Sequence, residues 1–234
     1  MIEIQSVSKF FGTHQALNEI NLSIIDGEFV TIFGPNGAGK TTLIRIISGL
    51  TQPSKGKIQF TELGSNKNFI KVLRNIGFVS HKPFLYENLT IEENLRFYGK
   101  MYELENLEKK VNEIISKFGL TLRRRDLVRV LSRGMEQRLS LARAIIHEPK
   151  ILLLDEPYTG LDQEAVNTFR RFLNDFHNEG KTIVMTTHDF THGLKNCTHV
   201  IVLSKGSIVY DEQISKINLE DFEKIYFKHI RPQE

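Results

Sequence analysis

The chain has 234 residues, of which 40% are hydrophobic and 25% are charged, and its 31 basic and 28 acidic residues give a net charge of +3. This composition predicts a soluble globular protein with one large domain or a domain with a smaller lobe, and the small positive excess gives no reason to expect nucleic acid as a partner. The single cysteine, Cys197, excludes an internal disulfide framework and makes the reducing cytosol the expected compartment.

The N-terminal region is rich in strand patterns. The first ten residues, MIEIQSVSKF, alternate apolar and polar side chains, which is typical of a strand and not of a secretory signal. Strands are also expected over 20–25 and 28–33, with Asp26 and Gly27 forming a tight turn between them. The chain therefore opens with a β-rich lobe.

The middle of the chain has a helical period. From about 90 to 148, apolar residues such as Leu95 and Val111 recur at helical spacing, and Gly119 is placed to end a helix. No apolar run reaches the roughly 20 residues that a membrane-crossing helix needs. The region predicts a helical insert, and any role at a membrane requires a partner.

Three phenylalanines in the same part of the chain could be taken for a partner-binding stripe. Phe69, Phe84 and Phe97 do not follow a helical spacing, however. Burial in the core is therefore the expectation for all three.

Short, almost continuous apolar runs follow the insert at 151–154, 182–187 and 199–204. Such runs are typical of parallel strands buried on both faces. A helical pattern that ends at Gly180 lies between the first two runs, which predicts a right-handed parallel crossover. Lys205 and Gly206 predict a hairpin turn, and a charged helix is expected over about 218–229.

The motif GPNGAGKTT predicts a phosphate-binding loop. It fits the pattern G-x-x-x-x-G-K-[ST] and lies between a predicted strand and a predicted helix, as the mechanism requires. Backbone N–H groups and the start of the helix would face the phosphates, Lys40 would bridge the terminal phosphates, and Thr41 would coordinate Mg²⁺. The ATP-binding residues expected here are Gly34, Pro35, Asn36, Gly37, Ala38, Gly39, Lys40, Thr41 and Thr42.

The motif ILLLDEP supplies an acidic pair at the end of a buried strand. Two carboxylates there would be costly unless they faced a cation or a polar cleft. Asp155 is therefore the candidate to hold Mg²⁺ through water, and Glu156 is the candidate to polarise an attacking water. Strand termination alone would be the preferred interpretation if the phosphate loop were missing.

The segment LSRGMEQR, at 131–138, completes a resemblance to the nucleotide-binding subunits of ABC transporters, which extends over essentially the whole chain in the family's motif order. Phe11 stands where that family has an aromatic ring stacked on adenine. Ser132 and Gly134 fall in the signature, and His188 in TTHD corresponds to the switch histidine, which places it with Lys40 and Glu156 in the catalytic set.

Two parts of the chain depart from the family pattern. In the signature, Arg133 replaces a glycine and Met135 replaces a glutamine. His81, at the end of IGFVSH, stands where a glutamine of the Q-loop reaches toward Mg²⁺ and the attacking water, so it joins the expected ATP-binding set and is a possible Mg²⁺ ligand. A histidine here, followed by ENLTIEENLRFYGKMY, resembles the ATP-binding subunit of the haem exporter of cytochrome c maturation. ABC-2-type exporters of drugs, polysaccharide or lipid share SRGM-like signatures and are the alternative.

The resemblance implies an α/β P-loop ATPase of ABC type, with an N-terminal antiparallel β lobe and a helical sub-lobe. Within a single domain, 1–80 and 150–234 would form the ATP-binding core, and about 81–149 would form the sub-lobe with the Q-loop and signature. ATP and Mg²⁺ would be the cofactors, and a homodimer would enclose two ATP molecules.

The partner implied by the resemblance is an integral membrane transporter subunit, docked near the Q-loop and the helical sub-lobe. The ATPase would then be cytoplasmic and peripheral on the inner face of the cell membrane, without nucleic acid. The rival classes are a soluble ABC ATPase that acts on nucleic acid or the ribosome, and a scaffold that binds ATP but hydrolyses little. Glu156 and His188 argue against the scaffold.

Other histidines do not form a convincing metal motif. His188 and His192 have the spacing of a zinc helix but lack the glutamate of H-E-x-x-H. Cys197 and His199 have no two further ligands in the sequence nearby, so a structural zinc site is not expected there.

Overall fold

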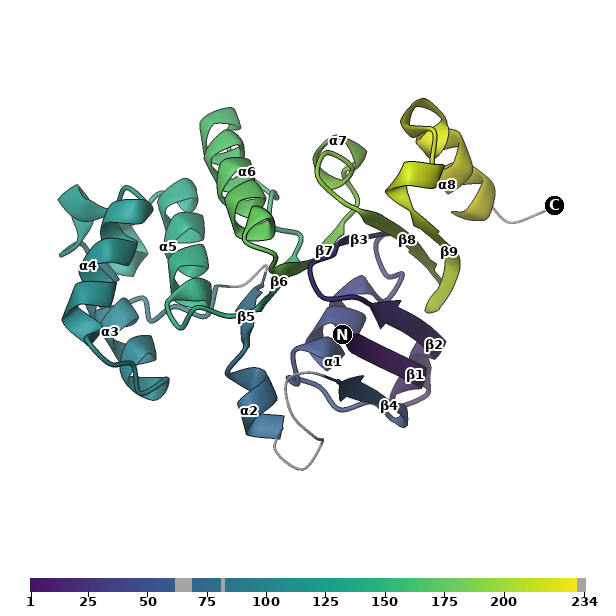
Figure 1. Cartoon of the computed structure of the whole chain (residues 1–234), viewed down its shortest axis with the longest axis horizontal. Helices are drawn as coiled ribbons and strands as arrows, with labels where there is room; N and C mark the ends of the chain where they lie inside the picture. Colours follow the sequence, from purple (N-terminus) through teal and green to yellow (C-terminus); the bar gives the residue numbers. More distant parts are fainter. Residues whose placement is uncertain (62–68, 81–82, 231–234) are drawn as a thin grey trace.

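The structure is a computed structural model that describes residues 1–61, 69–80 and 83–230 (Figure 1). The chain forms two sheets with helices around them. Figure 1 shows helices from the middle of the chain at one end of the molecule and the N-terminal sheet toward the other end.

The N-terminal strands form a three-stranded antiparallel sheet in the order β2-β1-β4. Its strands are β1 (Ile2–Phe11), β2 (His14–Ile24) and β4 (Lys55–Phe60). The predicted β-rich lobe is therefore confirmed. The pattern did not reveal β4, because four of its six residues are charged, glycine or polar side chains, without a clear alternation.

The second sheet has six strands in the order β5-β6-β7-β3-β8-β9. They are β5 (Ile76–Val79), β6 (Ile151–Asp155), β7 (Thr182–Thr187), β3 (Phe29–Phe33), β8 (His199–Ser204) and β9 (Ser207–Gln213). The first five are parallel, and β9 pairs with β8 as an antiparallel edge strand. The predicted α/β fold with a mainly parallel sheet is confirmed.

The two predicted turns have different roles. Gly27, with φ of 82°, makes the expected turn, but β2 and β3 on either side of it belong to different sheets. Lys205 and Gly206 have φ of 47° and 80° and join β8 to β9 as a hairpin. Positive φ at both central residues gives a turn whose twist matches that of the paired strands.

The described helices are α1 (Lys40–Ile47), α2 (Phe69–Leu73), α3 (Ile91–Met101), α4 (Leu107–Lys117), α5 (Arg133–Ile145), α6 (Gln163–Asn178), α7 (Phe190–Gly193) and α8 (Phe222–Ile230). Short 3-10 turns lie at Thr121–Arg123, Val128–Val130, Ile214–Lys216 and Leu219–Asp221. The helix ends predicted at Gly119 and Gly180 are confirmed, since these glycines follow α4 and α6 with φ of 64° and 75°. Within the described residues, no helix has the length and apolar character that a membrane span requires.

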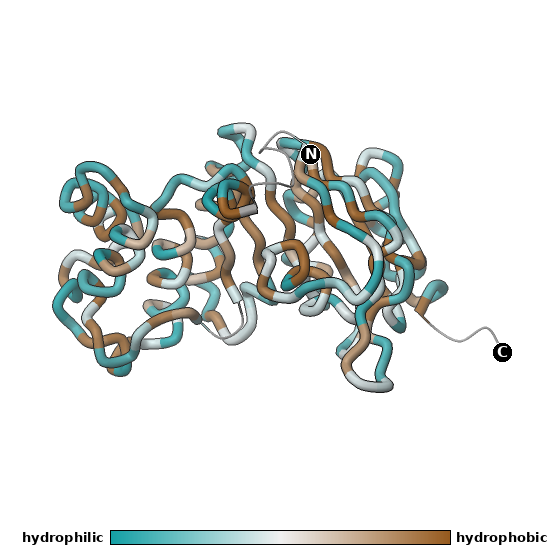
Figure 2. The backbone as a smooth tube through the Cα atoms, turned by 90° about the horizontal axis from the view of Figure 1, so that it is seen from below, coloured by the Kyte–Doolittle hydropathy of each residue, from teal (hydrophilic) through white to brown (hydrophobic). Residues whose placement is uncertain are grey.

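Both faces of the six-stranded sheet are buried. Along β6, Leu152 and Leu154 join one apolar cluster with α5 and α6, while Ile151 and Leu153 join a second cluster with α1 and the N-terminal sheet. Figure 2 shows the strands in the middle of the molecule largely in brown, for hydrophobic residues. Burial on both faces explains why these strands appear in the sequence as continuous apolar runs.

The expectation that the three phenylalanines are buried is wrong for two of them. The Phe84 and Phe97 residues are 39% and 36% exposed. Phe97 stands on α3 and packs against Tyr86, with ring centroids 4.8 Å apart, instead of entering the core. The Phe69 side chain lies outside what the structure describes.

Candidate active site

The predicted site residues meet where three neighbouring parallel strands end. β3, β6 and β7 lie beside one another in the order β6-β7-β3, so their carboxyl ends share one edge of the sheet. The phosphate loop follows β3, Asp155 ends β6, and His188 follows β7. Ligands of open α/β sheets bind at such an edge.

The loop between β3 and α1 needs glycine at two of its positions. A β-carbon at Gly34 would lie 2.3 Å from the carbonyl oxygen of Leu203, and one at Gly39 would lie 2.6 Å from that of Ala16. Gly39 also has φ of 105° and directly precedes the first residue of α1. Close packing of backbone on backbone therefore fixes where α1 begins and aims its N-terminus at the edge of the sheet.

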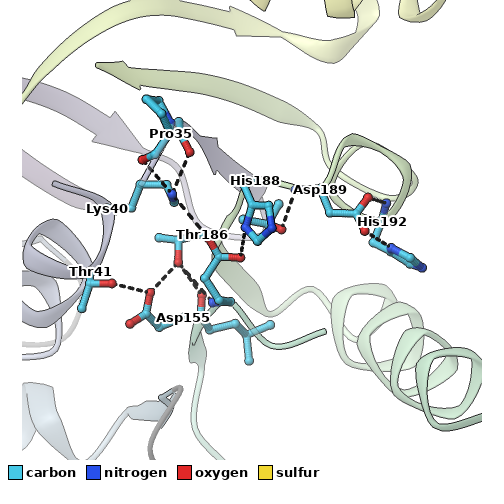
Figure 3. Close-up of polar contacts among 12 residues, drawn as sticks. Pro35, Lys40, Thr41, Asp155, Thr186, His188, Asp189 and His192 are labelled. Atoms are coloured by element: carbon cyan, nitrogen blue, oxygen red, sulfur yellow. Dashed lines mark hydrogen bonds and ion pairs between the residues drawn. The ribbon is translucent and has the colours of Figure 1, made fainter. Parts of the chain in front are cut away.

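Lys40, the first residue of α1, is held inside this loop. Its ammonium donates to the carbonyl oxygens of Gly34 and Pro35 at 2.7 and 3.3 Å, and lies 3.4 Å from a carboxylate oxygen of Glu156 (Figure 3). The Lys40 residue is only 6% exposed. A buried ammonium needs such partners, because removing an unpaired charge from water costs on the order of several kcal/mol.

Asp155 is a buried carboxylate held by two hydroxyl groups. Thr41 on α1 and Thr186 on β7 each donate to its Oδ1 atom, at 3.0 and 2.7 Å (Figure 3). Asp155 is 3% exposed, and it forms no ion pair with a residue that the structure describes. The carboxylate and the Thr41 hydroxyl thus place hard oxygen donors side by side, which is the ligand chemistry that Mg²⁺ prefers.

Glu156 has an uncommon backbone conformation for a residue with a side chain. Its φ is 50°, and its N–H donates to the carbonyl oxygen of Thr186 at 3.1 Å. Left-handed φ in a non-glycine residue costs about 1 kcal/mol or more and concentrates at functional sites. The conformation turns the carboxylate toward Lys40 and His188 instead of continuing the strand.

His188 approaches the same carboxylate from β7. Its Nδ1 lies 3.0 Å from Oε2 of Glu156, so Nδ1 carries the proton in this contact, because a carboxylate can only accept. The His188 side chain is 58% exposed, whereas that of Glu156 is 17% exposed. The imidazole therefore covers Glu156 from the solvent side.

Next to it, Asp189 and His192 form a separate pair. Asp189 caps α7 by accepting from the N–H of His192, and also accepts from the imidazole at 2.6 Å. Burial opposes ionisation of Asp189, but these hydrogen bonds outweigh it and hold the pKa of the carboxyl below its usual value. The two histidines of the zinc-like spacing thus point to different carboxylates.

Cys197 and His199, which were not expected to form a zinc site, have separate surroundings. Burial raises the pKa of the Cys197 thiol to about 11, which disfavours the thiolate that a metal would need. His199 lies 2.5 Å from Asp211 instead. Within the described ranges, no group of three histidine, cysteine or acidic residues has the arrangement of a metal site.

An open pocket of about 300 Å³ lies over the phosphate loop. Phe11, at the end of β1, lines it and is 53% exposed as a residue. The antiparallel sheet thus brings the predicted adenine-stacking residue beside the loop. The lining residues are Phe11, His14, Ala16, Pro35, Asn36, Gly37, Ala38, Gly39, Lys40, Thr41, Thr42 and Glu156.

Two predicted site residues lie elsewhere on the same chain. Ser132 caps α5 by accepting from the N–H of Met135, and with Gly134 it lines a different pocket, against α6. Neither residue lines the pocket over the phosphate loop. His81 lies outside the described residues, so its predicted place near Mg²⁺ stays a prediction.

Sequence reasoning missed Thr186. It is the next-to-last residue of the predicted strand TIVMTT and has the character of an ordinary β-branched strand residue. The signal was its register, because Thr186 lies directly opposite Asp155 once β6 and β7 are paired. That pairing follows from the crossover prediction, but the one-residue register does not.

The chain is similar to known proteins over most of its length. The ABC transporter family matches residues 17–159. An uncharacterised ABC transporter ATP-binding protein of Bacillus subtilis, YdbJ, is 35% identical over 89% of this chain and 68% of its own length. The sulfate/thiosulfate import ATP-binding protein CysA of Pectobacterium atrosepticum is 40% identical over 88% of this chain and 64% of its own length. The chain thus spans about two thirds of each of these relatives.

A solved structure agrees with the fold as well. The ATP-binding cassette MJ0796, in a dimeric post-hydrolysis state bound to ADP and Pi, superposes with a TM-score of 0.81 at 30% identity. The match covers 92% of this chain and 99% of that chain.

Thr186 provides a test of how the buried carboxylate is held. Thr186→Val keeps the shape but removes one of the two hydroxyl donors to Asp155, so the free energy of unfolding should fall by about 1–3 kcal/mol. Urea unfolding at pH 7 measures it. Thr186→Ser is the matched control, since it keeps the donor and loses only a methyl group. Equal stability of wild type and the valine variant, or a larger loss in the serine variant, would contradict the account.

Proposed function

This chain belongs to the ABC transporter family as an ATP-binding cassette, and on that premise we propose that it works as one of two copies whose ATP hydrolysis drives transport through a separate membrane subunit. The ATPase activity is the family's. Lys40, Asp155 and Glu156 meet at one edge of the sheet, where Lys40 pairs with Glu156 and Asp155 accepts from Thr41. This arrangement is the observation that supports the assignment to particular residues.

The residues present fit ATP and Mg²⁺. Terminal phosphates would replace Glu156 and the loop carbonyls as partners of Lys40, and the N-terminus of α1 would face them. Mg²⁺ would take Thr41 as a ligand, and Asp155 through water. When bound, the ion neutralises charge that develops on the phosphates.

Glu156 and His188 then supply the remaining chemistry. The Glu156 carboxylate is oriented by its left-handed backbone and by His188, and it would accept the proton of the attacking water. By donating its Nδ1–H to Glu156, His188 holds the carboxylate in place and covers it from solvent. These two residues would act as base and positioning group.

The separation of Ser132 and Gly134 from the phosphate loop supports a two-copy arrangement. Both residues stand at the N-terminus of α5, where a serine hydroxyl and backbone N–H groups could contact phosphate. They line a pocket that contains none of the Lys40 loop. In our proposal they contact the ATP held by Lys40, Thr41 and Phe11 of a second copy, as a homodimer would allow.

A cluster of exposed aromatic side chains supports the membrane partner. The aromatic face, as we call it, consists of the exposed Phe84, Tyr86 and Phe97, the half-buried Tyr98, and Met101, which stands one helical turn after Phe97 on α3. Its most exposed member, Met101, is 61% exposed, and Phe97 contacts both tyrosine rings. The face follows His81 by only three residues in sequence. Exposed clusters of aromatic and methionine side chains are typical of protein interfaces.

The cargo would be determined by the membrane subunit, because its path lies outside a cassette of this kind. Sulfate/thiosulfate import is the role in the name of one relative, CysA. Neither name of the two relatives above mentions haem, so haem export for cytochrome c maturation has only the resemblance around His81 in its support. ABC-2-type export remains the alternative, and a role on nucleic acid or the ribosome remains the rival class.

The proposed location and organisation follow from the same assignment. The cassette would lie on the cytoplasmic side, peripheral to the inner face of the cell membrane. We keep the predicted division into an ATP-binding core, 1–80 and 150–234, and a helical sub-lobe, about 81–149. The aromatic face and Ser132 would then both belong to the sub-lobe.

Glu156→Gln tests the catalytic assignment. The amide keeps the size of the carboxylate but cannot act as a base, so steady-state hydrolysis with Mg²⁺ should fall by about 100-fold or more while ATP still binds and stabilises a dimer. Glu148→Gln is the matched control, because Glu148 also has positive φ, 56°, but lies outside the site. Hydrolysis that is undiminished in Glu156→Gln would remove Glu156 from this role.

Met101→Glu tests the membrane partner. A charge on the aromatic face should lower recovery of the tagged chain with its membrane subunit in detergent extracts by about tenfold, the effect of losing about 1.4 kcal/mol of binding. Leu122→Glu is the control, since Leu122 is 98% exposed and stands in the turn Thr121–Arg123 instead of on α3. Unchanged recovery with Met101→Glu would contradict the proposed docking surface, and hydrolysis stimulated by nucleic acid would favour the rival class.

A further inference from the structure

Arg133 lies where the helix that carries Ser132 meets the turn that follows Glu156. It is the first residue of α5, and its guanidinium lies flat against Gly160. A β-carbon built at Gly160 would come within 2.5–2.7 Å of three guanidinium atoms. The contact therefore requires both the planar side chain at 133 and the absence of one at 160.

The turn under Arg133 begins at Glu156 itself. The N–H of Thr159 donates to the carbonyl oxygen of Glu156 at 3.3 Å, and that of Leu161 donates to Tyr158 at 3.3 Å. Gly160 is the third residue of the second turn and has φ of 74°, a position that favours glycine. A shift of Gly160 would thus reach Glu156 through two successive turns.

Gln137, four residues after Arg133 on α5, also contacts the segment that follows Glu156. Its amide donates to the carbonyl oxygen of Pro157 at 3.0 Å. Residues 133 and 137 lie on one face of the helix, because they are four apart. Both of them, together with Glu156 and Thr159, line one small cavity. The helix therefore holds the turn at two points, at Pro157 and at Gly160.

Helix stability does not explain an arginine at this position. A positive charge in the first turn opposes the helix dipole, which favours acidic residues there. Among the described residues, the Arg133 guanidinium forms no hydrogen bond or ion pair that would compensate. A residue that breaks a local rule without a local gain is a candidate for a functional role.

We propose that Arg133 is a positioning residue for hydrolysis, which acts through Gly160 to fix the turn that carries Glu156. The N-terminus of α5 and the Glu156 carboxylate then move as one unit. The inference rests on the proposed role of Glu156 as the base. It assigns a purpose to the arginine that departs from the signature of the family.

A double-mutant cycle tests the contact. Arg133→Ala should lower kcat about tenfold, with little change in KM for ATP and without a fall in Tm, since the variant also removes an unfavourable charge from the helix start. Arg133→Lys should behave like the alanine variant, because lysine keeps the charge but lacks the flat face. A purely structural role would lower Tm and leave kcat unchanged.

Gly160→Ala completes the cycle. The added methyl group should expel the guanidinium and lower kcat by the same factor, and the double variant should be no slower than either single variant. Gly180→Ala is the control for backbone strain, because Gly180 has φ of 75° and nothing within 4 Å of its built β-carbon. It should share any fall in Tm but not the fall in kcat.

The outcomes separate this inference from the proposed function. If Glu156→Gln abolishes hydrolysis but Arg133→Ala leaves kcat unchanged, or if the two single effects multiply in the double variant, the role of Arg133 is wrong and that of Glu156 stands. If Glu156→Gln hydrolyses ATP like wild type, the proposed base fails first. A shared, non-additive loss of kcat in Arg133→Ala and Gly160→Ala supports the positioning role.

Discussion

The site depends on one constraint, which is that a carboxylate ends a buried strand. Asp155 is 3% exposed, so its charge requires donors from the neighbouring elements, and Thr41 on α1 and Thr186 on β7 supply them. These hydrogen bonds join α1, β6 and β7 at one point. Lys40 directly precedes Thr41 and Glu156 directly follows Asp155, so the same contacts bring Lys40 and Glu156 into an ion pair.

Much of this arrangement could be predicted because its signals are local. The phosphate loop, the apolar runs of the parallel strands and the terminators Gly119 and Gly180 each depend on residues close in sequence. Parallel strands then place the ends of β3, β6 and β7 at one edge without further information. The α/β fold and the grouping of Lys40 with Asp155 therefore follow from the sequence alone.

What could not be predicted depends on contacts between distant segments. The hydroxyl of Thr186 matters only because β6 and β7 pair in one register, and a shift by one residue would turn it to the other face. Phe97 was expected in the core, but the orientation of α3 leaves it on the surface. The contact between Arg133 and Gly160 joins a helix start to a turn 27 residues away, and neither residue signals the other in the sequence.

The most direct test of the account is the binding of ATP to this edge of the sheet. Titration calorimetry with ATP should show binding to wild type with Mg²⁺ that weakens when EDTA removes the ion, because Thr41 and Asp155 can then contribute no metal contact. Lys40→Gln should bind at least about tenfold more weakly, the effect of losing one charge-assisted contact. Equal affinity in wild type and Lys40→Gln, with no effect of EDTA on either protein, would contradict it.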